Sequence, residues 1–249
     1  MTTTDMTIRP PADAAAGKPW GVWTSIAWVV VAVGFQLLFL FWIIHSPLLR
    51  SIGPVLYFLL WAISPVVLVV AVVIRHLSVP SYMAWTVPSL GDVIVAIGGA
   101  LVVCFGFGVL FYVVSGGTSI VGVNIADAYR HYLAAGGTPS RYLLKDYQAY
   151  LYAPLVEETV FRGFLWRGLA ASRLGNGGAW LLTSVLFVAS HVLDYTNPGG
   201  LMDVAAGGLI LGLVRWRTGS ATASMITHSL YNLWGDVGGA MLTVAIGWP

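Results

Sequence analysis

The stretch Tyr152–Trp166, YAPLVEETVFRGFLW, holds the only two glutamates of the chain, Glu157 and Glu158, and Arg162 follows four residues after the second. The residues around these three are mostly apolar. Placing a carboxylate or a guanidinium in hydrocarbon costs about 2.5 to 3.5 kcal/mol even on the most lenient scale. Three such groups within six residues need partners, and membrane clusters of this kind are functional by default. We expect the chemistry here; a structural charge cluster that pins helix packing is the alternative.

The composition around this stretch is that of an integral membrane protein. Hydrophobic residues make up 58% of the chain and charged residues 9%, against about 25% charged residues in soluble proteins. Three long uncharged runs approach the roughly 20 residues that a spanning helix needs. They are Val22–Ile44, a retained anchor rather than a signal peptide, Val55–Ile74 and Val93–Val114. The net charge of +2 comes without a basic stripe, so no nucleic-acid partner is expected.

The remaining apolar segments are shorter, and several fall below spanning length. They are Tyr147–Trp166, Ala179–Leu193, Gly199–Val214, Ala221–Trp234 and Val237–Trp248. Short membrane helices are tolerated where they line a protein-enclosed cavity. The sequence therefore predicts an all-α, polytopic bundle of about eight helices with an interior polar cavity. We divide it into a polar tail (1–19), N-terminal helices with a long connector (20–146) and a catalytic core (147–249).

Lysine and arginine indicate the orientation of the chain. With eight spans and the N-terminus inside, seven of these cations fall on the inner side and four on the outer side. The excess favours a cytoplasmic N-terminus. The Ala- and Gly-rich composition favours a bacterial protein, hence the bacterial inner membrane.

The spacing of the charged cluster assigns different roles to its two carboxylates. Glu158 and Arg162 are i and i+4 on a helix, so an ion pair can close across one turn. Glu157 points about 100° away from Glu158, and no cation lies near it in the sequence. A carboxylate that is not neutralised by a cation is suited to act as a general base. Pro154 predicts a kink or a new helix start, which would place both carboxylates in the first turns. Gly163 would let a neighbouring helix approach closely.

Two further pairs of residues recur at helical spacing. Phe187 and His191 are i and i+4, as are His228 and Asn232. Each pair therefore lies on one face of its segment. Hydrogen bonding between helices is the alternative for both histidines. Combined with Glu157, a base, two imidazoles and an amide could activate water and stabilise an oxyanion.

These residues match the motifs of a known family. Glu157–Gly163 reads EExxxR, Phe187–His191 reads FxxxH, and His228–Asn232 reads HxxxN. The chain resembles the CPBP family over roughly Tyr147–Asp236. That family covers type II CAAX prenyl endopeptidases and bacteriocin-processing or bacteriocin-immunity proteins.

The resemblance implies an intramembrane glutamate peptidase with eight helices and a conical cavity, which hydrolyses a membrane-associated peptide or protein near the bilayer surface. Glu157 and His191 would activate a water, supported by Glu158 and Arg162. His228 and Asn232 would form the oxyanion hole. No metal or cofactor is expected, and whether the substrate is prenylated stays open.

Three other functions compete with this interpretation. A zinc hydrolase could use Glu157, His191 and His228, although HExxH is absent and Arg162 would repel a dication. A proton-relay transporter could use the same cluster, although no inverted repeat is present. A non-catalytic bacteriocin-immunity or assembly factor could retain all three motifs.

Several residues outside the motifs are expected to be structural. Asp194 and Asp203 flank the turn Tyr195–Gly200 and mark a solvated loop. Gly208 and Gly212 form a small-residue face for tight helix packing within the monomer. Arg215 and Arg217 are expected to be interfacial anchors.

Overall fold

The computed structural model describes residues 18–46, 53–107, 110, 129–145, 147–194 and 198–245. Throughout these residues the chain forms helices joined by short turns, and no strand occurs among them. The prediction of an all-α membrane bundle is confirmed. The protein is an integral membrane protein, since three described helices are long and apolar enough to cross a bilayer.

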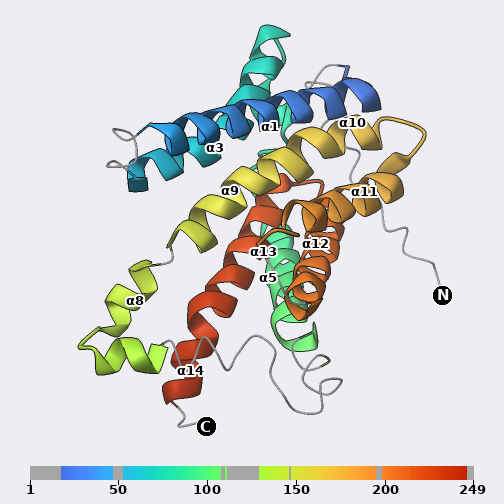
Figure 1. Cartoon of the computed structure of the whole chain (residues 1–249). Helices are drawn as coiled ribbons and strands as arrows, with labels where there is room; N and C mark the ends of the chain where they lie inside the picture. Colours follow the sequence, from blue (N-terminus) through green and yellow to red (C-terminus); the bar gives the residue numbers. More distant parts are fainter. Residues whose placement is uncertain are drawn as a thin grey trace, which may run out of the picture.

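The N-terminal part is a pair of apolar helices, α1 (Val22–His45) and α3 (Gly53–Ile74), which lie side by side (Figure 1). Large apolar side chains of α1 are exposed, as expected of a surface that meets lipid. Two residues of α1, Ser25 and Ala32, are buried against the rest of the protein. Gly168 faces Ser25 of α1 at a distance that leaves no room for a Cβ. The first two predicted runs are helices whose ends lie within two residues of the expected limits.

The third predicted run begins at α5 (Leu90–Leu101), which Ser89 caps through the backbone N–H of Asp92. It continues as a π-helix, η1 (Val102–Phe107). The end predicted at Val114 lies outside the described residues. A short helix, α4 (Val79–Tyr82), joins α3 to α5.

One continuous helical run carries the two glutamates (Figure 1). It consists of η2 (Gln148–Tyr152), α9 (Ala153–Glu158), η3 (Thr159–Leu165) and α10 (Trp166–Ala170). The new helix start expected at Pro154 is present, since the α-helix α9 begins at Ala153, although π-helical turns on both sides keep the run continuous. A π-turn ends just before α9, so Pro154 occupies the first turn of α-helix, where its missing N–H is tolerated. The carboxylates consequently lie in the middle of the run.

The last two predicted segments form a single run as well. α13 (Ala221–Leu233), η4 (Trp234–Gly238) and α14 (Gly239–Ala245) follow one another without a break. The break expected near Gly235, between the last two predicted segments, does not occur. Gly235 and Gly238 lie within the π-helix η4 instead.

α12 (Pro198–Thr218) is long and apolar enough to span the membrane, although the sequence predicted a shorter segment. It packs against α11 (Gly175–Ser190). At their contact, a Cβ atom placed at Gly212 would lie only 2.6 Å from the ring of Trp180, so a larger residue would not fit there. The small-residue face expected at Gly208 and Gly212 is confirmed. Close packing by α11 also keeps this glycine-rich segment helical.

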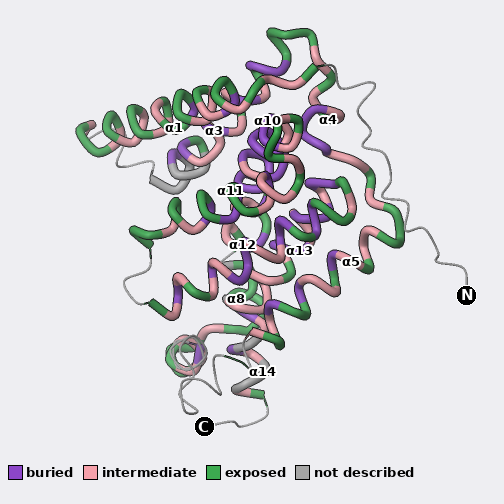
Figure 2. The backbone as a smooth tube through the Cα atoms, turned by 90° about the vertical axis from the view of Figure 1, so that its right-hand side faces the viewer, coloured by how far each residue is buried: buried purple, intermediate pink, exposed green. Residues whose placement is uncertain are grey.

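Burial is concentrated where the helical run of the glutamates meets α11, α12 and α13, whereas α1 is mostly exposed (Figure 2). Gly163 allows a close approach as predicted, because the Met83 carbonyl lies 3.1 Å from its ideal Cβ position. The neighbour is the turn after α4 rather than a helix.

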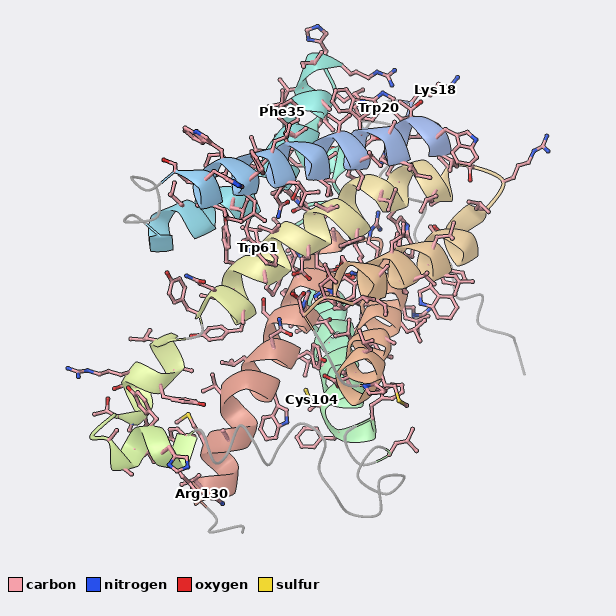
Figure 3. All side chains as sticks on the ribbon, in the orientation of Figure 1. Lys18, Trp20, Phe35, Trp61, Cys104 and Arg130 are labelled. Carbon is pink, nitrogen blue, oxygen red and sulfur yellow. The ribbon has the colours of Figure 1, made fainter. Side chains whose placement is uncertain are left out.

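Part of the long connector is described. Residues 129–134 and α8 (Pro139–Lys145) are helical, and three tyrosines, Tyr129, Tyr142 and Tyr150, pack them against α14. The remainder of the predicted connector, 115–128 and 146, lies outside the described residues. Lys18 and Arg130 lie at opposite ends of the molecule (Figure 3). The orientation in the membrane stays a prediction.

Candidate active site

The centre of the site is an ion pair with no solvent exposure. The Arg162 Nη1 donates to Glu158 Oε1 over 3.0 Å, and both side chains are fully buried. The predicted i,i+4 pair is thus present. His228, seventy residues along the chain, places Nδ1 3.0 Å from the same carboxylate oxygen. Glu158 therefore joins the first and third sequence motifs.

The Arg162 guanidinium also holds the site to α12. Its Nη2 donates to the Gly208 carbonyl over 2.8 Å, and Ser184 of α11 donates to that carbonyl over 2.9 Å. The face of the Phe187 ring lies 4.6 Å from the guanidinium carbon, a favourable cation–π contact. The phenylalanine of the second motif therefore stabilises the arginine of the first.

Arg215 forms a second hydrogen bond between α12 and the glutamate-bearing helix, with α12 now supplying the donor. This side chain is buried, and its Nε donates to the Arg162 carbonyl over 2.8 Å. Its guanidinium also lies over the Trp166 ring. The expectation of an interfacial anchor is wrong for Arg215, whereas Arg217 is exposed as predicted. Sequence spacing could not show this, because the acceptor is a backbone carbonyl of another helix.

Glu157 and His191 face each other across a gap. Glu157 Oε2 is buried, has no hydrogen-bond partner, and lies 3.8 Å from His191 Nε2. The two side chains keep 10% and 18% exposure, respectively. His191 Nδ1 lies 2.8 Å from the Phe187 carbonyl, which can only accept, so Nδ1 carries a proton. The Nε2 atom is therefore the ring nitrogen that faces Glu157.

His228 and Asn232 lie on one face of α13, but their partners differ. His228 is bonded to Glu158, whereas the Asn232 side-chain amide donates to the Ala149 carbonyl of η2 over 2.8 Å. One amide N–H of Asn232 thus ties α13 to the glutamate-bearing helix. The second amide N–H is not needed for this contact.

The zinc alternative requires Glu157, His191 and His228 to converge on one point. Among the described residues no three histidine, cysteine, aspartate or glutamate side chains form such a group. His228 Nδ1 is directed to Glu158 rather than to Glu157.

A second acidic contact lies one helical turn away from His228. The Tyr231 hydroxyl of α13 donates to the Asp203 carboxylate of α12. Asp203 was expected in a solvated loop. That expectation is wrong, because α12 begins at Pro198 and places Asp203 within a helix. Asp194 is exposed in the turn after His191, as predicted.

Comparison with known proteins agrees with the motifs. Residues 141–234 match the family model described as type II CAAX prenyl endopeptidase Rce1-like. No curated protein and no solved structure matches the chain. The matched segment includes every residue of the site, so the resemblance inferred from the three motifs is confirmed there.

Proposed function

Because residues 141–234 match the type II CAAX prenyl endopeptidases, we propose that this protein is a membrane-embedded endopeptidase in which a glutamate and a histidine activate water. The observation that carries the proposal is the pair formed by Glu157 and His191. A buried carboxylate oxygen of Glu157 that has no hydrogen-bond partner faces the imidazole Nε2 of His191 at 3.8 Å. Orphaned buried acceptors are rare in proteins and call for a function.

The separation of Glu157 and His191 suits a shared water molecule. A hydrogen bond of about 2.8 Å to each atom is compatible with a distance of 3.8 Å between them. Glu157 would remove a proton from this water while His191 orients it. The resulting hydroxide would attack the carbonyl carbon of the scissile peptide bond.

The tetrahedral intermediate carries negative charge on the former carbonyl oxygen. We assign its stabilisation to His228 Nε2 and to the second amide N–H of Asn232. Since His228 Nδ1 faces a carboxylate, Nε2 can donate only in the imidazolium form, whose charge Glu158 would balance. Glu157 would then return its proton to the leaving amine, which gives a carboxylic acid and an amine from peptide and water.

In this scheme Glu158 and Arg162 do not touch the substrate. They hold the His228 side chain in place. The Glu158 carboxylate holds His228, and Arg162 holds Glu158 together with the Gly208 carbonyl. Breaking either contact would displace the donors from the oxyanion.

The substrate belongs to the same proposal. Polar groups within a bundle of membrane helices favour a membrane-associated peptide or protein, with the bilayer as the second partner. The proposal also includes a bacterial inner membrane and a cytoplasmic N-terminus, which the excess of inner lysine and arginine supports.

The proposal can be tested by mass-spectrometric mapping of peptide termini in host membranes. Membranes with the wild-type protein are compared with membranes that contain Glu157→Gln at equal abundance. Glutamine has nearly the shape of glutamate, and Glu157 Oε2 has no hydrogen bond to lose, so the variant should fold. We expect termini that occur only with the wild type.

Purified protein then sharpens the result. General acid–base groups contribute about 10²- to 10⁴-fold, so kcat of Glu157→Gln should fall by that range. Identical termini with wild type and folded variant would contradict the proposal and favour an immunity or assembly factor. Activity that is lost together with stoichiometric zinc would favour a metallopeptidase instead.

A further inference from the structure

Asp203 is an acidic residue that the proposed reaction leaves unused. It lies in α12, a helix long enough to span the membrane, and its side chain is half-buried. Within the described parts of the chain, the Tyr231 hydroxyl is the group bonded to its carboxylate. A carboxylate offers about four acceptor positions, and one hydroxyl fills one of them. The contact within the protein therefore satisfies Asp203 only in part.

The position of this contact relates it to the site. Tyr231 follows His228 by three residues on α13, and the two ring centres are 6.4 Å apart. The Tyr231 ring lies 3.2 Å from the ideal Cβ position of Gly207, so the glycine makes room for it. Gly208, next to that glycine, supplies the carbonyl that holds Arg162. Asp203 therefore precedes Gly208, whose carbonyl anchors the site, by five residues on α12, which is about 1.4 helical turns.

The cationic groups of the site that are bonded to a carboxylate face Glu158. Arg162 is bonded to Glu158 and to the Gly208 carbonyl, and His228, whose imidazolium form the proposed reaction uses, faces Glu158 as well. The Asp203 carboxylate is bonded to a neutral hydroxyl. A positive ligand group beside Asp203 would therefore balance its charge.

We propose that the Asp203 carboxylate, positioned by the Tyr231 hydroxyl, forms a subsite for a cationic side chain or amino group of the substrate peptide. An ammonium or guanidinium brings three or five N–H donors, which would fill the open acceptor positions. Its charge would also offset the cost of a carboxylate in a helix that is long and apolar enough to span the membrane. The subsite rests on the proposed endopeptidase function and assigns it a class of substrate, peptides with lysine, arginine or a free amine near the cleaved bond.

The test uses the full-length protein in lipid nanodiscs and a library of dodecapeptides with randomised central positions and blocked ends. Products are sequenced by mass spectrometry. We expect the wild type to enrich lysine and arginine about tenfold at one position near the cleaved bond. Asp203→Lys should reverse the preference to aspartate and glutamate at that position, and Tyr231→Phe should weaken it.

Asp194→Lys is the matched control. It makes the same change of charge in the exposed turn after His191 and should leave the preferred residues unchanged. Cleavage with the same residue preference in wild type and Asp203→Lys would overturn the subsite and leave the endopeptidase intact.

A binding measurement separates the subsite from the reaction. The Glu157→Gln protein is incubated with the same library, and retained peptides are sequenced. Enrichment of lysine and arginine that disappears in the Glu157→Gln, Asp203→Asn double variant would support the subsite even if the wild type cleaves nothing. Retention without preference for a cation would overturn it.

Discussion

The two halves of the molecule differ in how far their helices are buried within the protein. The helices α1 and α3 lie on the N-terminal side, and α9 to α13 lie on the C-terminal side. In the most apolar part of α1, 6% of the residues are buried, against 56% in α12. α1 therefore relies on apolar side chains that face lipid, whereas α12 exchanges hydrogen bonds with its neighbours. The difference teaches that ionisable groups persist in this membrane protein where several helices supply partners.

The partners in the C-terminal half are reciprocal. Arg162 donates to a carbonyl of α12, and Arg215 of α12 donates to the carbonyl of Arg162 itself. Two helices are thereby joined by a side chain in each direction. Substitutions at either arginine should cost far more than substitutions on the lipid-facing side of α1.

The largest loss of stability is expected for Arg162→Met. The change leaves the buried Glu158 carboxylate without its cation, and breaking a buried ion pair costs about 3 to 5 kcal/mol. The free energy of unfolding can be measured by titration with denaturing detergent in mixed micelles. The double variant Glu158→Gln, Arg162→Met removes the stranded charge and should recover part of the loss. A cost of Arg162→Met below about 1 kcal/mol would show that the network does not stabilise the C-terminal half.

A smaller effect is expected for Arg215→Met. The variant loses a hydrogen bond from a charged group, which contributes about 1.5 to 3 kcal/mol. Because this bond holds the turn of Arg162, kcat should fall while KM changes little. The control is Arg217→Met, an exposed arginine two residues later on the same helix. Equal losses in the two variants would refute a special role for Arg215.

The smallest effect is expected for Leu38→Ala in α1. The Leu38 side chain is 67% exposed, so its truncation opens no cavity and should change the unfolding free energy by less than about 0.5 kcal/mol. The same change at Leu211 of α12, which is 1% exposed, should cost about 2 to 5 kcal/mol. Both variants are measured by the detergent titration used for the arginines. Similar costs at the two leucines would mean that α1 is packed against protein rather than lipid.

The amino-acid sequence was sufficient to predict the membrane class, the first two helices and the ion pair of Glu158 with Arg162. These features depend on local composition and on helical spacing, which the chain displays directly. The three motifs likewise identified Glu157, His191, His228 and Asn232 as candidates, and the structure brings the two histidines to the two glutamates.

Other features depended on contacts between segments far apart in the chain. The helix continues through Pro154 because π-helical turns flank it, and no local sequence pattern predicts where such turns occur. The inward roles of Arg215 and Asp203 required knowledge of the helix each one faces, because a cation near a helix end or an aspartate near a turn looks like a surface residue in sequence. Spacing along one helix shows which side chains share a face. Only the packing of that face against its neighbours decides which carbonyl, ring or carboxylate each side chain meets.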